Sequence, residues 1–434
     1  MSTDDAVAQE TPEVAPPLRI PAFRWLMAYR LLTIFSYQIV AVTVGWHVYE
    51  LTRDPWKLGL LGLTEVLPFF CVAPFAGYLV DHLPKRRVGA IACIGLAMTP
   101  AILATVAWGL VFSEDASARL WLIYAAIVFT GMVRAFLGPV YNTLFACALR
   151  RDQFARGSSI GSVVFQGALS LGPAVGGAII ALVAKFGDHP EHSVVPAGPA
   201  YIVGAICALG AAYALTRLRV TEPALSHERS PIFASIGEGL RFVLKTPVML
   251  GAMALDMFAV LFGGAISLAP AFVKDVLHAG PDALGILRSA PAAGAALVGL
   301  WCARHPIQRN AGRLMFGAVA GFGLCIIGFG LSEMLWLSVF FIFLSGAFDG
   351  VSVVIRSTIL QLATPDHMRG RVSSINSIFI SSSNELGAFY AGSMARLLGL
   401  VNAVVLGGCV TLGIVAFTAW RVPALRRLDM RTLH

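Results

Sequence analysis

The sequence predicts an all-α integral membrane protein with twelve transmembrane helices in two six-helix bundles that are related by a parallel repeat. Three observations lead to this prediction: an apolar composition, long apolar blocks along the whole chain, and an internal repeat. Of the 434 residues, 57% are hydrophobic and only 13% are charged, whereas a soluble protein carries about a quarter charged residues. The surplus apolar residues fall in long blocks and do not alternate as they would in a half-buried sheet.

Each block is long enough to cross a bilayer, because a hydrocarbon core of about 30 Å needs roughly 20 apolar residues per helix. No large soluble domain fits between the blocks. The first block follows an acidic, Pro-rich leader and is too long for a cleavable signal peptide. The predicted spans are 26–49, 57–80, 88–111, 120–146, 158–184 and 199–217 in the first half, and 248–271, 282–302, 314–332, 335–360, 373–396 and 401–420 in the second.

These spans divide the chain into five parts. We expect a short amphipathic helix at Ile232–Lys245, lying on the membrane surface within the linker between the halves. The five parts are a disordered cytoplasmic N-terminus (1–20), an N-terminal six-helix bundle (21–217), a cytoplasmic linker (218–246), a C-terminal six-helix bundle (247–421) and a cytoplasmic tail (422–434).

The distribution of Lys and Arg indicates which side faces the cytoplasm. If the N-terminus is cytoplasmic, the segments on that side hold 22 of the 32 Lys and Arg residues, and the opposite segments hold six. We therefore attribute the net charge of +8 to topology and inner-leaflet contact, and not to nucleic-acid binding. All seven Cys lie in or at the ends of spans, which argues against both a disulfide framework and a zinc site.

The chain repeats itself at a shift of 215 residues, where residues 131–177 align with residues 346–392 without a gap. Eleven of these 47 positions are identical. The alignment maps the fourth and fifth spans onto the tenth and eleventh, and both copies cross the membrane in the same direction. Two halves related in this way suit alternating access, with a substrate held between them near the midplane. Because one chain contains both halves, we expect a monomer.

A loop between the second and third spans, residues 77–87, reads GYLVDHLPKRR. It resembles the signature loop of the major facilitator superfamily at Gly77, Asp81, Lys85 and Arg86, and departs from it at two other positions. We expect Asp81 to accept backbone N–H groups at a helix start, and Lys85 and Arg86 to reach the lipid headgroups. The loop would then be a latch that holds the halves in the outward-open state. An ordinary tight turn with positive-inside charges is the alternative.

Two further motifs resemble the same superfamily. Gly172, Pro173, Gly176 and Gly177 in the fifth span are similar to its antiporter motif, and Arg134 begins a stretch similar to its buried-Arg motif. Small residues let helices approach closely in lipid, and Pro173 interrupts the hydrogen-bond ladder. We therefore expect a bendable wall that reseals when the halves rock, with plain helix packing as the alternative.

The stretches 48–52 and 368–372 resemble the bacterial exporter branch of this superfamily, which includes the enterobactin exporter and macrolide and multidrug efflux proteins. The resemblance implies proton-driven export of a small amphiphilic molecule, either a siderophore or a drug-like compound, across the bacterial inner membrane. A proton-coupled nutrient importer and a lipid flippase stay open as alternatives.

Charged residues inside spans are candidates for the coupling chemistry, because a charge at the bilayer centre costs at least about 3 kcal/mol. Arg134, Asp349, Glu385 and Asp256 are expected near mid-membrane. The repeat makes Arg134 and Asp349 equivalent, so we expect them to face each other across a central cavity. Burial raises the pKa of a carboxyl group and a nearby Arg lowers it. We hypothesise that Asp349 or Glu385 carries the proton and that Arg134 tunes it, with a static ion pair as the alternative.

Other polar residues within spans have less specific roles. Arg30 and Arg356, near the cytoplasmic ends, are expected to extend toward water. The remaining polar candidates for the cavity wall are Glu65, Gln38, Tyr37, Asn142, Asn376 and Asn384.

An enzyme is the rival class of function. Residues 157–161 match the nucleophile-elbow pattern by letter, but they begin a membrane helix and follow no strand. The sequence has no HExxH motif, P-loop or metal-ligand cluster, so we expect no catalytic residue, metal, cofactor or ATP-driven pump on this chain. The substrate itself stays open, because the expected cavity holds both Arg134 and acidic residues.

Overall fold

The structure is a computed structural model that describes residues 16–111, 115–186, 196–222, 232–305, 307, 309–365 and 368–429. Across these ranges the chain forms helices and no strand, which confirms the all-α fold class. Most of the predicted disordered N-terminus lies outside the described residues. The described part begins with a short 3-10 turn, η1 (Pro17–Arg19), before the first long helix.

Six long helices of the N-terminal half pack together. Each coincides with one predicted span to within five residues at either end. The helices are α1 (Pro21–Thr52), α2 (Pro55–His82), α3 (Lys85–Ala107), α4 (Ala116–Ala148), α5 (Phe154–Phe186) and α6 (Gly198–Arg217), with a 3-10 turn η2 (Arg151–Gln153) before α5.

The C-terminal half also follows the predicted spans, but its first span is broken. A turn at Gly264 separates α8 (Pro247–Gly263) from η3 (Ala265–Leu268) and α9 (Ala269–Asp275). The other helices are α10 (Pro281–Arg304), α11 (Ala311–Gly330), α12 (Leu335–Ala363), α13 (Arg369–Leu398), α14 (Leu400–Arg421) and the short α15 (Pro423–Arg426).

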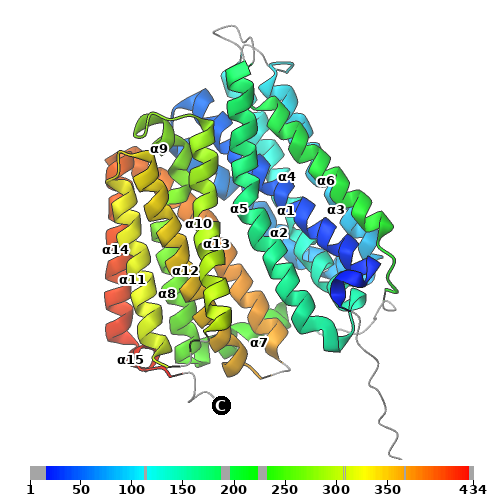
Figure 1. Ribbon diagram of the computed structural model, residues 1–434, viewed down its shortest axis with the longest axis vertical. Helices are drawn as coiled ribbons and strands as arrows, with labels where there is room; N and C mark the ends of the chain where they lie inside the picture. The colour runs from blue at the N-terminus through cyan, green and yellow to red at the C-terminus, as the bar shows by residue number, and fades with distance from the viewer. Residues whose placement is uncertain are drawn as a thin grey trace, which may run out of the picture.

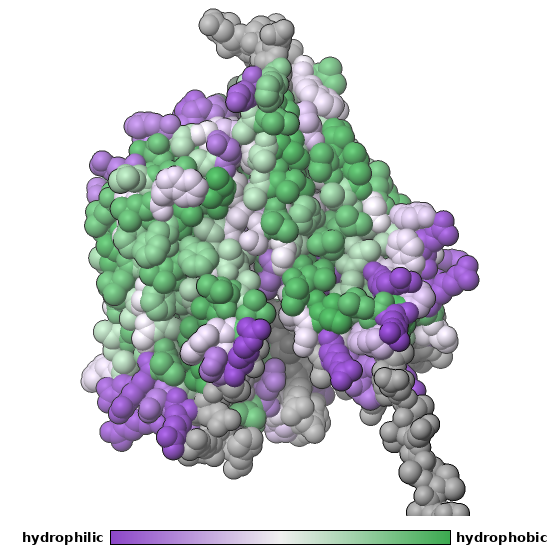
Figure 2. Space-filling model, viewed as in Figure 1, coloured by the Kyte–Doolittle hydropathy of each residue, from purple (hydrophilic) through white to green (hydrophobic). Residues whose placement is uncertain are grey.

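Eleven helical segments of the described chain are long and apolar enough to cross a membrane. The twelfth predicted span is α13, which is 30 residues long but too polar to meet the same measure. It packs between α2 and α8, so protein surrounds much of its polar surface. Figure 2 shows a broad apolar surface with hydrophilic side chains gathered toward the two ends of the molecule. The chain is thus a multi-pass membrane protein.

Equivalent glycines of the repeat lie at equivalent helix crossings. A Cβ atom at Gly131 would collide with the backbone of Glu65 where α4 crosses α2, and one at Gly346 would collide with Pro291 where α12 crosses α10. Only glycine allows such close backbone approach in a membrane bundle. The internal repeat is therefore a repeat of packing.

The two halves meet at one end of the molecule and diverge at the other, where α1 begins and where α7 (Ile232–Lys245) and α15 lie (Figure 1). We call the first the closed end and the second the terminal end. A buried apolar cluster crosses between the halves, and it includes Ile39 and Trp46 of α1 with Phe272 of α9. Figure 2 shows the surface notched between the halves near the terminal end.

The linker helix α7 covers the residues predicted for it and packs on α13 and α8. An ion pair of 2.6 Å joins Glu238 of α7 to Arg371 of α13. The linker helix is thus attached to the C-terminal half. Its position on a membrane surface stays a prediction.

Candidate functional site between the two halves

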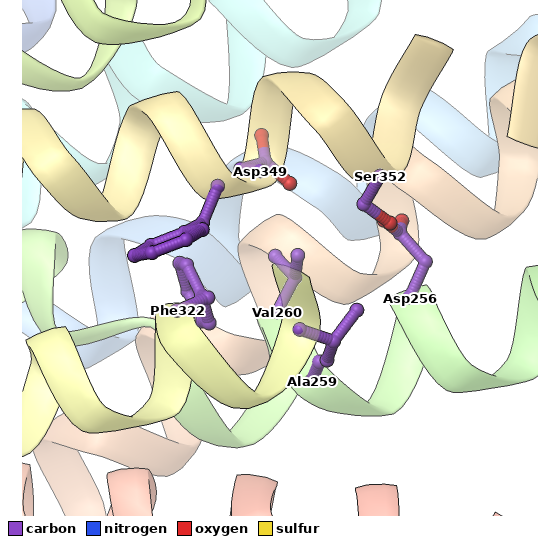
Figure 3. Close-up of a pocket in the computed structure, with 8 residues that line it drawn as sticks. Asp256, Ala259, Val260, Phe322, Asp349 and Ser352 are labelled. Carbon is purple, nitrogen blue, oxygen red and sulfur yellow. The ribbon is translucent and has the colours of Figure 1, made fainter. Parts of the chain in front are cut away.

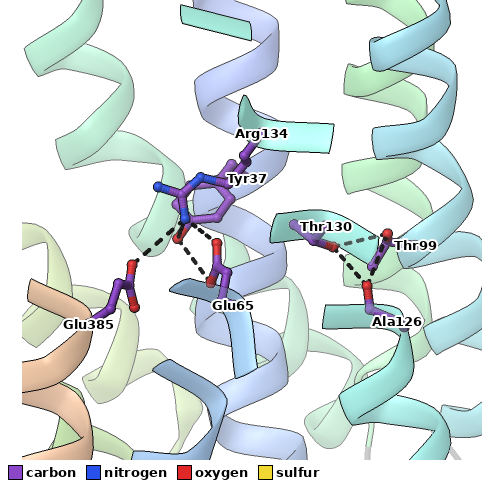
Figure 4. Close-up of polar contacts among 7 residues, drawn as sticks. All are labelled: Tyr37, Glu65, Thr99, Ala126, Thr130, Arg134 and Glu385. Atoms are coloured by element: carbon purple, nitrogen blue, oxygen red, sulfur yellow. Dashed lines mark hydrogen bonds and ion pairs between the residues drawn. The ribbon is translucent and has the colours of Figure 1, made fainter. Parts of the chain in front are cut away.

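A charged cluster links the two halves at about half the length of the helices. Arg134 of α4 forms an ion pair and hydrogen bond with Glu65 of α2, and its Nη1 lies 3.7 Å from Oε1 of Glu385 on α13. The same Nη1 donates to the hydroxyl of Tyr37 on α1 at 2.8 Å, and that hydroxyl lies 3.4 Å from Oε2 of Glu65. Figure 4 shows the side chains of Tyr37, Glu65 and Glu385 converging on the guanidinium. One cation therefore joins carboxylates from both halves.

Close helix packing places this cluster. Gly131 brings the backbone of α4 against Glu65, one turn from Arg134. On the other side, Gly62 of α2 lies against the backbone of Glu385, which brings α13 of the other half to the same level. Beside the cluster, Thr130 donates to Thr99 at 3.0 Å and holds α4 against α3 (Figure 4). The guanidinium also stacks on the Tyr37 ring, with its carbon 4.3 Å from the ring centroid.

The predicted pairing of Arg134 with Asp349 is wrong in this structure. Arg134 instead pairs with Glu65 of α2 and Glu385 of α13. Asp349 makes no ion pair or hydrogen bond within the described residues. It lines a small pocket inside the C-terminal half, between α8, α11 and α12, with Asp256, Phe322 and Ser352 (Figure 3). The pocket has room for about one water molecule.

Asp256, the fourth predicted coupling residue, has a partner that the sequence analysis assigned to the membrane surface. Arg356 of α12 forms an ion pair with Asp256, and Ser352 donates to the same carboxylate at 3.4 Å. Arg356 is only 4% exposed and Asp256 only 5%. The expectation that Arg356 extends toward water is therefore wrong. Buried charges need partners, and spacing along one helix did not reveal that α8 would supply one.

The remaining candidates for the cavity wall are spread over several helices. Gln38 packs against Gly172 of α5. Asn142 is exposed, and Asn384 donates to the carbonyl of Ile380 on its own helix. The Oδ1 of Asn376 is buried without a hydrogen-bond partner. Of the six polar candidates, only Glu65 and Tyr37 join the central cluster.

One glycine of the predicted antiporter motif lies where the halves touch. A Cβ at Gly177 would lie 2.5 Å from the carbonyl oxygen of Pro281 and 2.7 Å from Gly285 on α10. Gly172 and Gly176 instead let α5 pack on α1 within the N-terminal half. Pro173 lies within the continuous helix α5 between these contacts, and its carbonyl would lie 2.8 Å from a Cβ at Gly285. The motif therefore packs α5 against α1 of the same half and against α10 of the other half. Its gating role stays a proposal.

Two polar links, which the sequence analysis did not identify, join the halves at the closed end. Lys274 of α9 forms an ion pair with Glu50 of α1, and the hydroxyl of Tyr49 donates to Asp275. Each link pairs the end of α1 with the end of α9. The only available sequence signal was the charge of these residues near span ends, which did not indicate their partners.

The start of the helix after the predicted latch loop has a cap that the sequence analysis did not identify. Glu222, which follows α6, accepts the backbone N–H of Lys85 at 2.7 Å and that of Arg86 at 3.3 Å, and pairs with the Arg86 side chain at 3.1 Å. The expectation that Lys85 reaches the headgroups is wrong, because it is only 3% exposed. A Cβ at Gly77 would meet no atom within 4 Å. The side chain of Asp81 lies outside the described residues, so its capping role stays a prediction.

Comparisons with known proteins place this architecture in a family. Residues 13–434 match the family model described as transmembrane secretion effector. The multidrug efflux pump Tap of Mycolicibacterium fortuitum is 26% identical over 401 residues, which cover 90% of this chain and 93% of that protein. The enterobactin exporter EntS of Escherichia coli O81 (strain ED1a) is 25% identical over 390 residues, covering 87% and 86%.

Solved structures support the same fold. A bacterial homologue of the human lysosomal transporter Spinster, in an inward-facing and unoccupied conformation, has a TM-score of 0.69 at 14% identity and covers 96% of this chain and 98% of its own. A bacterial homologue of the iron transporter ferroportin has a TM-score of 0.68 at 16% identity, with coverage of 93% and 99%. The chain therefore belongs to the transmembrane secretion effector family of the major facilitator superfamily, and it is a membrane transporter and not an enzyme.

Proposed function

We propose that this transporter exports a small amphiphilic molecule, a siderophore or a drug-like compound, across the bacterial inner membrane by proton antiport. Relatives over most of the chain include a multidrug efflux pump and an enterobactin exporter. The direction of transport is drawn from these relatives, and the driving ion from the chemistry of the central cluster.

The charge distribution supports an orientation with the terminal end in the cytoplasm. That end carries most of the Lys and Arg residues, as expected for cytoplasmic segments. In this orientation the closed end faces the outside, so the structure corresponds to an inward-facing state. The links Glu50–Lys274 and Tyr49–Asp275 then act as an outer gate that must open for release.

The observation that carries the proposal is the position of Arg134 between carboxylates of the two halves. A proton on Glu385 would remove one charge of the link between Arg134 and α13. A proton binds Glu385 better when α13 has moved away from Arg134. Protonation therefore shifts the equilibrium toward the conformation in which the halves are separated at this level. Glu65 keeps Arg134 paired when the link to α13 is broken. Asp349, which lines a small, mostly apolar pocket without an ion pair, is the second proposed proton carrier.

The test uses inside-out membrane vesicles with a pH-sensitive dye and a panel of siderophores, macrolides and cationic drugs. We expect at least one compound to collapse the proton gradient only when the protein is present. Arg134→Gln and Glu385→Gln should lower this coupled flux by about 100-fold, equivalent to about 2.7 kcal/mol. Asp282→Asn, which removes an exposed carboxylate at the start of α10, is the matched control.

Three results would overturn the proposal. Coupled flux that survives Glu385→Gln and Asp349→Asn, singly and together, would remove both proposed proton carriers. Movement of labelled lipid in proteoliposomes without an ion gradient would point to a flippase. Uptake in the opposite direction would point to an importer.

A further inference from the structure

Arg30 of α1 lies against aromatic rings with no acidic partner. Its guanidinium carbon is 3.9 Å from the ring centroid of Tyr141 on α4 and 5.1 Å from that of Phe165 on α5. Within the described residues Arg30 forms no ion pair, its polar side-chain partner is Tyr141, and its Nε is buried without a hydrogen-bond partner. The sequence-based expectation was a side chain that extends into water. The structure instead holds the cation between two rings.

Helix periodicity places Arg30 and Tyr141 on the same helix faces as two residues of the central cluster. Arg30 is seven residues before Tyr37 on α1, and Tyr141 is seven residues after Arg134 on α4. Seven residues are about two helical turns, so each member lies on the same helix face as its partner in the cluster. Because α1 and α4 run in opposite directions, both steps lead toward the terminal end, by about 10 Å.

Besides α1 and α4, α5 contributes an aromatic side chain next to Arg30. Phe165 is seven residues before Gly172, whose face packs on Gln38 of α1, so Phe165 also points toward α1. It is 38% exposed. Gly161 lies one turn earlier, where a Cβ would be 2.7 Å from the Tyr141 hydroxyl. The lack of a side chain at Gly161 therefore leaves room for Tyr141 to lie under Arg30.

The charged partners of three other arginines of the bundle interior differ from those of Arg30. Arg134 has Glu65 and Glu385, and Arg356 has Asp256. Arg288 of α10 donates to the carbonyl of Ala41 at 3.3 Å. Among the described residues Arg30 faces two aromatic rings and no carboxylate, and a charged side chain inside a membrane bundle that lacks an oppositely charged partner commonly faces a watery pathway or a ligand.

We propose that Arg30, Tyr141 and Phe165 form an anion-binding subsite for the transported molecule, which takes a carboxylate or similar planar anion attached to an aromatic or apolar body. The guanidinium presents a fork of donors that matches a carboxylate, and the rings offer flat apolar surface beside it. Since the subsite lies between the central cluster and the terminal end, it would meet the substrate first on entry from that side. The inference rests on the proposed function, because it names the substrate class of the same transport pathway.

The experiment measures equilibrium binding to the purified full-length protein in nanodiscs without an ion gradient. Two xanthene dyes of similar shape and opposite charge, the anion 6-carboxyfluorescein and the cation rhodamine 6G, are titrated by fluorescence anisotropy. We expect wild-type protein to bind the anionic dye more tightly. Arg30→Gln should weaken the anionic dye by at least about tenfold, which corresponds to about 1.4 kcal/mol, and leave the cationic dye within about twofold or tighter.

Two further variants sharpen the measurement. Arg30→Lys keeps the charge but loses the donor fork, so we expect about a threefold loss for the anionic dye. It also provides a second reading if Arg30→Gln does not fold. Arg24→Gln is the matched control, because Arg24 is an exposed arginine near the start of the same helix.

Specific results decide between the outcomes. No saturable preference of the wild type for the anionic dye, or equal losses of both dyes in Arg30→Gln, would overturn the subsite. Because no proton gradient is present, a failure of proton antiport leaves this binding result unchanged. Selective loss of the anionic dye without any coupled flux in vesicles would therefore support the subsite and contradict the proton-antiport mechanism.

Discussion

The two halves share their packing but not their chemistry. At the equivalent positions Gly131 and Gly346, both halves bring a neighbouring helix into backbone contact. Three residues further along, one half has Arg134, which binds carboxylates of both halves, and the other has Asp349, which has no partner in the described chain. The repeated framework therefore fixes where side chains point, while the identity of those side chains decides what the position does.

An ion pair within one half differs from an ion pair between the halves in how deeply it is buried. Arg356 and Asp256 join α12 to α8 inside the C-terminal half and are almost fully buried. Arg134 and Glu385 join α4 to α13 across the halves. The side chain of Arg134 is about a quarter exposed and that of Glu385 about a fifth. A pair within one rigid bundle stabilises that bundle, whereas a pair between bundles must break when they move. The following predictions test this distinction.

The largest effect on stability is expected from Asp256→Asn or Arg356→Gln. Either variant leaves a buried charge unpaired, which costs about 3–5 kcal/mol, so the midpoint of thermal unfolding in detergent should fall sharply. The double variant should recover part of the loss. Glu385→Gln should change the free energy of unfolding by less than about 1 kcal/mol, because Arg134 keeps Glu65. Equal losses in Asp256→Asn and Glu385→Gln would contradict the distinction.

A smaller effect is expected from added methyl groups at glycines. Gly346→Ala should cost about 1–3 kcal/mol, because it overpacks a contact within one half. Gly177→Ala should leave the unfolding midpoint nearly unchanged and should open the closed end, since the halves can move apart there. Distances between spin labels on α5 and α10 measure this opening. Gly413→Ala, where a Cβ meets no atom within 4 Å, is the control, and an unchanged distance distribution in Gly177→Ala would refute the expectation.

The smallest effect concerns the start of the third membrane span in each half. Glu222 accepts N–H groups at the start of α3, and the carbonyl of Leu428 accepts the N–H of Gly312 near the start of α11. In each half, the acceptor follows the last long helix. Glu222→Ala should cost about 1 kcal/mol of stability, the usual value of a helix N-cap. Glu238→Ala, in an exposed pair on α7, should cost less, and a reversed order of the two would argue against capping.

The sequence by itself determined the class, the spans and the repeat of this protein. Apolar blocks of membrane length leave the chain no other way to satisfy its backbone than helices, and the repeat of small residues recorded which helices cross closely. The same reasoning identified Arg134, Glu385 and Asp256 as membrane-embedded charges that need partners.

Only the tertiary structure decided those partners. Pairing depends on how helices rotate and which neighbours they meet, and a residue's depth along one helix specifies neither. Thus Arg134 binds Glu65 and Glu385 instead of Asp349, Arg356 is buried against Asp256, and Arg30 lies between two rings. The two ion pairs of Arg134 join residues that lie 69 and 251 positions apart in the sequence, so no local pattern records them.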